Sequence, residues 1–268
     1  GDTSAVDALK KDLAELRNRK IHLLKSAGFP EDYLEPVYDC PDCKDTGYIG
    51  NKKCHCFKKA IIGLLYDQSN IKKFPVEADF SNFRLDYYPV SHYDKKTGRS
   101  SRSMMEDTLR ICHHFIDSFG TEFNNLFFYG DVGVGKTFLS TCIAKEIMNR
   151  EYSVLYFSAP QLFNTLAKNA FDKNDIDAHN MCEYIFDCDL LIIDDLGTEY
   201  TNAFIASQFF TCINERLLHR KSTIISTNLS LESLADLYTE RSFSRITSRY
   251  SLLKIVGDDI RIKKKLEH

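Results

Sequence analysis

The chain has 268 residues, of which 43% are hydrophobic and 27% are charged, a composition typical of globular proteins. Its net charge of −3 argues against binding nucleic acid by bulk electrostatic attraction, although it is compatible with a local basic surface. No apolar run is long enough to span a bilayer and no secretory signal opens the chain, so we expect a cytoplasmic protein with no membrane partner.

The first predicted element is a helix over residues 4–27. Aliphatic residues from Val6 to Leu24 recur at helical spacing and form an apolar stripe. Gly28 and Pro30 end the helix. Packing of this stripe on its own domain is the simpler expectation, and docking to another protein is the alternative.

A cysteine cluster follows the helix, with the pairs Cys40–Cys43 and Cys54–Cys56 separated by a glycine-containing stretch. Thiolates at this spacing can close a tetrahedral zinc site, which stabilises a segment too small to build its own core. The tight Cys-x-Cys pair leaves open that His55 replaces one sulfur. A redox Cys-x-x-Cys and unliganded thiols are the alternatives, but a redox motif does not need a second pair.

We predict three parts of the chain from these patterns and from the polar, weakly patterned stretch that follows. A second short helix is expected over residues 57–69. The predicted parts are an N-terminal helical zinc-binding domain over residues 1–72, a linker over 73–103 and a second domain over 104–265.

Strands alternate with helical patterns from residue 104 onward. Short, nearly continuous apolar strands with helical crossovers predict a parallel sheet that is covered on both faces, with its ligand at the carboxyl ends of the strands. The predicted strands are Leu126–Tyr129, Val154–Phe157, Leu190–Ile193 and Thr223–Ser226.

The first of these strands leads into a segment that reads G-x-x-x-x-G-K-T and is followed by a helical pattern, which is the order of a phosphate-binding loop. Its glycines let backbone N–H groups surround a polyphosphate. Lys136 supplies a mobile positive charge for the β- and γ-phosphates, and the Thr137 hydroxyl suits Mg²⁺. A simple glycine turn is the alternative. The predicted nucleotide-binding residues are Gly130, Asp131, Val132, Gly133, Val134, Gly135, Lys136, Thr137 and Phe138.

A later strand ends in two carboxylates, Asp194 and Asp195. The first would hold the Mg²⁺ of the nucleotide, and the second would orient or deprotonate the attacking water. Acidic residues also end strands as helix caps, but a pair downstream of a phosphate loop in the same sheet favours catalysis. Asn228 ends the next strand, where it would reach the γ-phosphate, cap the helix over residues 229–237, or do both.

Arginines four residues apart, Arg241, Arg245 and Arg249, follow on one predicted helix. An ATPase with no other arginine candidate in its own site would receive one from a neighbouring subunit, to stabilise charge on the transferring phosphoryl group. A solvated or ion-paired helix face has the same spacing.

Together these motifs resemble the AAA+ ATPases, and in particular the DnaC/DnaI-type replicative helicase loaders with their IstB-like relatives. The resemblance covers about residues 75–262. It implies a P-loop AAA+ parallel sheet flanked by helices, with a small N-terminal helical zinc-binding domain. The motifs that carry it are Gly130–Thr137, Leu190–Gly197, Ser226–Asn228 and Glu240–Ile246, with Asp79–Phe83 at the start of the ATPase domain.

The resemblance also implies roles for individual residues. Arg245 would be an arginine finger acting across a subunit interface, Asp194 the Mg²⁺ carboxylate and Asn228 the first sensor. The helical insert over residues 159–187 would match an insertion that faces single-stranded DNA. Phe171 is the aromatic residue that we assign to stacking on DNA there, and a core position in a helical hairpin is its alternative.

Two departures from the family pattern concern hydrolysis. AAA+ enzymes usually have Glu at the second carboxylate, and Asp195 is one methylene shorter, which predicts slow hydrolysis. The chain after Asn228 is short for a full helical lid, which leaves Arg261 as a weak candidate for the second-sensor arginine.

We therefore expect an ATP-dependent loader of a DnaB-type replicative helicase onto single-stranded DNA in replication initiation. It would use ATP, Mg²⁺ and Zn²⁺ and self-associate into an AAA+ oligomer. An IstB-like ATPase that assists a transposase is one alternative, and a nucleotide-gated DNA-binding adaptor that does not hydrolyse ATP is another. The N-terminal zinc module favours the loader, because loaders of this kind engage the helicase through such a module.

Overall fold

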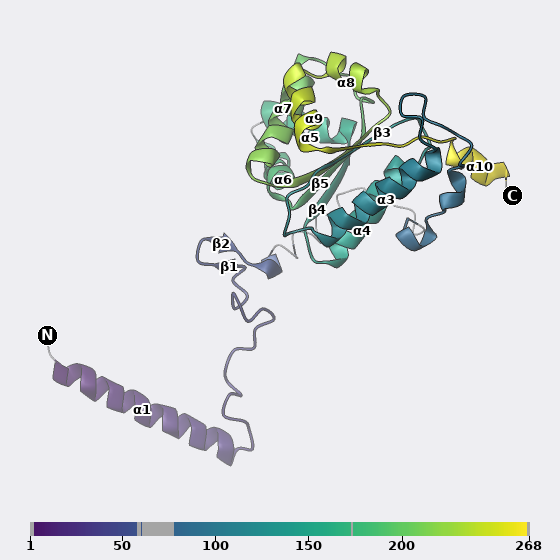
Figure 1. Cartoon of the computed structure of the whole chain (residues 1–268). Coiled ribbons are helices and arrows are strands. Elements are labelled where there is room, and N and C mark those ends of the chain that lie inside the picture. Colours follow the sequence, from purple (N-terminus) through teal and green to yellow (C-terminus); the bar gives the residue numbers. More distant parts are fainter. Residues whose placement is uncertain (1–2, 58–59, 61–77, 173, 267–268) are drawn as a thin grey trace. The chain divides into compact units, whose positions relative to one another are not determined.

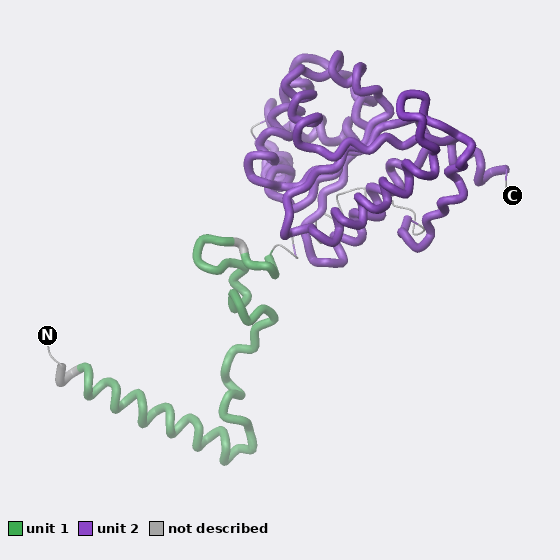
Figure 2. Tube along the Cα trace, in the orientation of Figure 1, with its two compact units in different colours: residues 1–57 green, residues 58–268 purple. Residues whose placement is uncertain are grey.

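The computed structural model describes residues 3–57, 60, 78–172 and 174–266 (Figure 1). The chain forms two compact units, residues 1–57 and 58–268, which are coloured separately in Figure 2. The predicted helix over residues 57–69 lies almost entirely outside the described residues. None of the helices in the described part of the chain combines the length and the apolar character that a bilayer crossing requires.

The first unit begins with helix α1 (Thr3–Ser26), which confirms the predicted N-terminal helix. After α1 the chain turns at Gly28, whose φ of 78° favours glycine. The antiparallel strands β1 (Tyr48–Ile49) and β2 (Lys52–Lys53) form a hairpin between the two cysteine pairs.

The second unit is built around a five-stranded sheet of order β4-β5-β6-β3-β7, in which all neighbouring strands are parallel. The strands are β3 (Leu126–Tyr129), β4 (Val154–Ser158), β5 (Leu190–Leu196), β6 (Ser222–Thr227) and β7 (Ser251–Lys254). The four predicted strands and their parallel arrangement are confirmed. Strand β7, a short edge strand that pairs only with β3 among the described strands, was not predicted.

Helices cover both faces of this sheet. The helical elements are η2 (Phe80–Asn82), η3 (Leu85–Tyr87), α3 (Ser101–Asp117), α4 (Lys136–Asn149), α5 (Ala159–Phe171), α6 (Ile176–Asp187), α7 (Ala203–Leu218), α8 (Leu231–Leu237), α9 (Glu240–Arg249) and α10 (Ile260–Leu266). Helices α3 and α4 lie on one face of the sheet and α5, α6 and α7 on the other (Figure 1). Side chains of α3 and α4 form one core layer with strand residues such as Phe128, and side chains of α5, α6 and α7 form the other with residues such as Phe127. Successive strand residues face opposite layers, which explains why the strands are apolar throughout.

Residues 78–103, which the sequence placed in the linker, lie on the second unit. Tyr87 and Tyr88 are buried in the layer that contains α3 and α4. The carboxylate of Asp94 is also buried and bonds to Lys254 on β7. This segment therefore brings aromatic side chains to the edge of the phosphate loop. The domain boundaries predicted from the sequence stay a prediction.

Candidate functional site

The phosphate loop joins the carboxyl end of β3 to the first residue of α4, as the sequence predicted. Gly135 precedes α4 with a φ of 105°. A Cβ atom at this position would lie 2.6 Å from the Tyr88 hydroxyl oxygen, and that hydroxyl donates to the carbonyl oxygen of Val134 at 2.8 Å. Both the backbone conformation and the close approach of Tyr88 therefore require glycine here.

The Lys136 side chain is buried and folds back over its own loop. Its Nζ donates to the carbonyl oxygens of Gly130 at 2.8 Å and Asp131 at 2.6 Å. Burial lowers the pKa of Lys136, and the negative charges of Asp195 and Asp194 oppose that effect. A cation that is held by neutral carbonyl oxygens can exchange them for the more strongly attracting oxygens of a phosphate.

The structure brings Thr137 and Asp194 together. Asp194 lies on β5 with only 6% of its surface exposed, and its Oδ1 and Oδ2 lie 3.2 Å and 3.0 Å from the Thr137 hydroxyl oxygen. A hydroxyl and a carboxylate that converge beside a phosphate loop are the protein ligands that a nucleotide-bound Mg²⁺ takes. The two residues, which were predicted from separate motifs, are thus in direct contact.

Asp195 and Asn228 lie next to this pair. Burial raises the pKa of the Asp195 carboxyl, and the charge of Asp194 raises it further. The Asn228 amide nitrogen lies 3.5 Å from Asp195 Oδ1, a long contact. The capping alternative for Asn228 is wrong, because Ser230 caps α8 by accepting from the backbone N–H of Ser233.

A cavity of about 290 Å³ lies at the phosphate loop. Lys136, Thr137 and Asp195 line it with polar groups, and Phe83 and Tyr88 line it with aromatic side chains. The two rings are stacked, with centroids 5.7 Å apart and an interplanar angle of 7°. The cavity therefore combines charged groups for phosphates with aromatic side chains for a base.

The C-terminal helix α10 closes one side of the cavity with Ile260 and Arg261. Nε and NH2 of Arg261 donate to the two carboxylate oxygens of Asp259, at 3.1 Å and 2.8 Å. Arg261, predicted only as a weak candidate for the second-sensor arginine, thus lines the cavity. Tyr88 and Ile260 were not predicted, since no short motif links their segments to the phosphate loop.

Arg245 lies on α9 and does not line this cavity. Its side chain is exposed, and its Nε donates to Oδ1 of Asn214 on α7 at 3.1 Å. The described structure therefore gives Arg245 no role in the site of its own chain, which leaves an action on a neighbouring chain as the role to test.

Phe171 ends α5 and is 76% exposed, so its alternative as a core residue of the hairpin is wrong. Its ring lies 5.0 Å from that of Phe204 at the start of α7, with an interplanar angle of 38°. Ile176, at the start of α6, is also exposed. Phe171 and Ile176 thus leave apolar surface open to solvent at the end of α5 and the start of α6.

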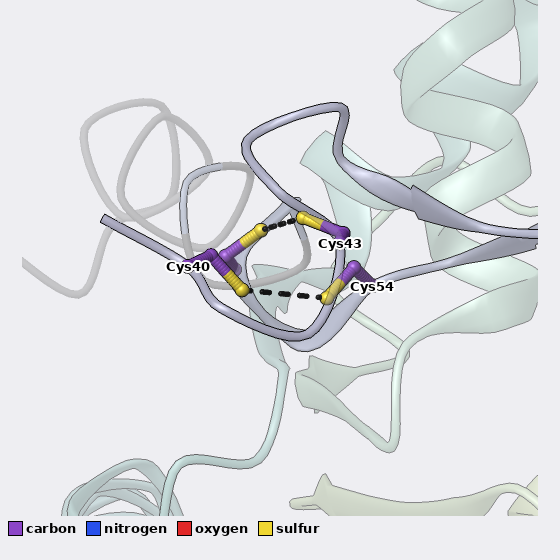
Figure 3. A group of neighbouring side chains, drawn as sticks. Cys40, Cys43 and Cys54 are labelled. Atoms are coloured by element: carbon purple, nitrogen blue, oxygen red, sulfur yellow. Dashed lines mark hydrogen bonds between the residues drawn. The ribbon is translucent and has the colours of Figure 1, made fainter. Parts of the chain in front are cut away.

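The cysteine pairs form a second candidate site, in the N-terminal unit (Figure 3). Sγ of Cys40 lies 3.7 Å from that of Cys54, and Sγ of Cys43 lies 3.3 Å from that of Cys56. Zinc–sulfur bonds of about 2.3 Å in a tetrahedron place sulfur atoms about 3.8 Å apart. The four sulfur atoms, all within 4.8 Å of one another, thus fit a single zinc ion and are too far apart to be disulfides.

The loop around the sulfur atoms supports this arrangement. Burial raises the pKa of Cys43, but hydrogen bonds from Cys56 and from the backbone N–H of Gly47 outweigh it and bring the pKa to about 7, whereas the same contact with Cys43 raises the pKa of Cys56. His55 Nε2 lies 3.4 Å from Cys40 Sγ and 3.2 Å from Asp42 Oδ2. His55 thus lies beside the four sulfur atoms and not in place of one of them.

Comparison with known proteins gives consistent matches. The family described as IstB-like ATP binding protein matches residues 68–268. The phage-like element PBSX protein XkdC of Bacillus subtilis is 27% identical over 84% of this chain and 84% of its own length. The replicative helicase loader DnaC of Escherichia coli is 23% identical over 72% of this chain and 73% of its own. A crystal structure of the DnaC helicase loader, 26% identical, superimposes with a TM-score of 0.52 over 65% of this chain and 97% of that one.

Proposed function

The chain belongs to the family of IstB-like ATP-binding proteins, and we propose that it is an ATP-dependent loader that delivers a DnaB-type replicative helicase to single-stranded DNA. The observation that carries the proposal is the similarity to a DnaC helicase loader over 72% of the chain. Two features of the structure support it: a nucleotide-sized cavity at the phosphate loop and a separate N-terminal unit that leaves an apolar helix face exposed.

ATP would lie with its phosphates on the glycine-rich loop and its base against the aromatic side chains that line the cavity. Lys136 would exchange its carbonyl partners for β- and γ-phosphate oxygens, and the N-terminus of α4 would add its partial positive charge. Thr137 and Asp194 would hold Mg²⁺, which when bound neutralises charge on the phosphates. Asp195 would accept a proton from the attacking water, while Asn228 would orient that water or the γ-phosphate.

Hydrolysis would depend on self-association into an AAA+ oligomer. Arg245 is exposed on α9 and does not line the cavity of its own chain, so its guanidinium is accessible to a neighbouring copy, whose nucleotide it would contact. A guanidinium at that place would stabilise the charge that develops on the transferring phosphoryl group. The Asn214 contact would hold the Arg245 side chain in a fixed direction before assembly.

Single-stranded DNA would bind at the tip of the α5–α6 insert. Phe171 offers an exposed ring backed by Phe204, and bases stack on such rings without regard to sequence. Such stacking would allow a chain with a net charge of −3 to bind DNA locally.

The N-terminal unit would hold zinc at its four cysteines and use α1 to engage the helicase. Val6, Leu9, Leu13 and Leu16 are each more than half exposed and recur at alternating spacings of three and four residues, the pattern of a coiled-coil seam. Basic residues predominate beside the seam, at Lys10, Arg17 and Arg19. A helix of the helicase with an apolar seam and acidic flanks is the complementary partner.

The test is to mix the protein with the replicative helicase of its host and to measure complex mass with and without ATP and single-stranded DNA. We expect a stable complex that Leu13→Asp and Leu16→Asp each abolish and that Asn18→Asp, on the opposite side of α1, leaves intact. Failure of the wild-type protein to bind the helicase would contradict the loader. Binding of a transposase instead would favour the IstB-like alternative, and ATP binding without turnover would favour the adaptor.

A further inference from the structure

The strand that carries the two carboxylates is irregular at the place where they lie. Ile193 on β5 pairs with Ile225 on β6, but the next paired residues are Leu196 and Thr227. Three steps along β5 thus correspond to two steps along β6. This one-residue excess is a β-bulge, and it falls on Asp194 and Asp195.

The bulge allows two consecutive side chains of β5 to face the phosphate loop. Adjacent side chains of a regular strand point to opposite faces, so a regular β5 would direct only one of two consecutive aspartates toward the phosphate loop. Here both face it, since Asp194 bonds to Thr137 and Asp195 lines the cavity. Asp195 has a left-handed φ of 56°, a conformation that is strained for a non-glycine residue and therefore needs support from its surroundings.

Ser226, on β6, faces the bulge and bonds to both aspartates. Its hydroxyl donates to Oδ1 of Asp194 and accepts from the backbone N–H of Asp195 at 3.0 Å. Ser226 is fully buried, so neither bond competes with solvent. One hydroxyl thus fixes the side chain of the first carboxylate and the backbone of the second.

We propose that Ser226 is a positioning residue that holds the β5 bulge and thereby aims both Asp194 and Asp195 at the bound nucleotide. The inference rests on the proposed ATP-binding site and concerns how its metal-binding carboxylate is oriented. Groups that bond to a metal ligand typically change metal affinity or activity by about 10- to 100-fold when they are removed. Removal of the Ser226 hydroxyl has a second consequence, because it also leaves the backbone N–H of Asp195 without its acceptor.

Ser226→Ala in the full chain tests the proposal, with Thr227→Val as the matched control. Thr227 is buried on the same strand, and its hydroxyl donates to the carbonyl oxygen of Leu196 instead of touching a carboxylate. The measurement is the affinity for a fluorescent ATP analogue as a function of Mg²⁺ concentration, together with ATP turnover and the melting temperature.

We expect Ser226→Ala to raise the Mg²⁺ concentration at half-saturation by about tenfold or more and to lower kcat, with affinity in the absence of Mg²⁺ changed less than about threefold. Ser226→Thr, which restores a hydroxyl, should recover part of the Mg²⁺ dependence. Thr227→Val should lower the melting temperature without moving the Mg²⁺ dependence. An unchanged Mg²⁺ dependence in Ser226→Ala, or an equal change in Thr227→Val, would overturn the inference. Absence of nucleotide binding by the wild-type protein would instead refute the proposed function.

Discussion

The hydroxyl oxygen of Thr137 lies 3.0 Å from Oδ2 of Asp194, so the first turn of α4 and the end of β5 meet at one pair of side chains. We predict that Thr137→Val weakens Mg²⁺-dependent ATP binding by about tenfold or more, because Mg²⁺ loses an oxygen ligand while the loop and Lys136 remain. Calorimetric titration with ATP, with and without Mg²⁺, measures this. Thr137→Ser is the matched control and should bind as the wild type does; equal affinity of the valine variant would contradict the assignment.

The raised pKa of Asp195 predicts a pH-dependent stability effect. A carboxyl whose pKa is higher in the folded state than in the unfolded state costs stability as pH rises from its ordinary pKa of about 3.9 through the folded value. Asp195→Asn should therefore raise the melting temperature at pH 7, and the gain should vanish near pH 4. Thermal unfolding between pH 4 and pH 7 measures this gain. Asp236→Asn, at an exposed position on α8, is the control. A gain that does not depend on pH would argue against the charge as its cause.

Arg245→Ala should lower the rate of ATP turnover by up to about 10³-fold, while the affinity for ATP stays unchanged. Mixing it with Lys136→Ala should restore turnover, because a mixed interface combines an intact loop from one copy with an intact arginine from the other. Steady-state hydrolysis of the single variants and of the mixture tests this. Arg110→Ala, at an exposed position on α3, is the control and should keep the wild-type turnover. Full activity of Arg245→Ala would rule out a cross-subunit role.

Phe171→Ala should weaken binding to single-stranded DNA by about 1–3 kcal/mol if one base stacks on this ring. Phe171→Tyr keeps the ring and should bind like the wild type. Fluorescence anisotropy with a labelled oligonucleotide, in the presence of ATP and at a fixed salt concentration, measures the difference. Equal binding by the alanine variant would place the DNA elsewhere.

The cysteine site should hold one zinc ion per chain. Cys43→Ser and Cys54→Ser should each lose the metal, because a structural zinc site needs all four ligands. Cys182→Ser, in α6 of the other unit, should keep it. Elemental analysis measures the metal, and chelation should unfold the N-terminal unit, since its cluster of buried cysteines provides most of its core. A metal-free wild-type protein that remains folded would contradict the assignment.

Local patterns were sufficient for much of this protein. The strand positions, the parallel sheet, the phosphate loop and the cysteine spacing all depend on residues that are close in sequence, and apolar periodicity and glycine placement record them directly. The strand of residues 251–254 was not predicted because only its two central residues, Leu252 and Leu253, are apolar, so it lacks the continuous apolar run of the other strands.

Tertiary structure decided how distant segments combine. The two consecutive aspartates can be read from the sequence, but the bulge that aims both of them and the Ser226 hydroxyl that bonds to both depend on the register between two strands. The cavity lining likewise brings Phe83 and Tyr88 together with residues of α10, which is far away along the chain. Such contacts produce no periodic pattern in the sequence. They depend on how distant segments pack against the sheet, and not on residues that are neighbours along the chain.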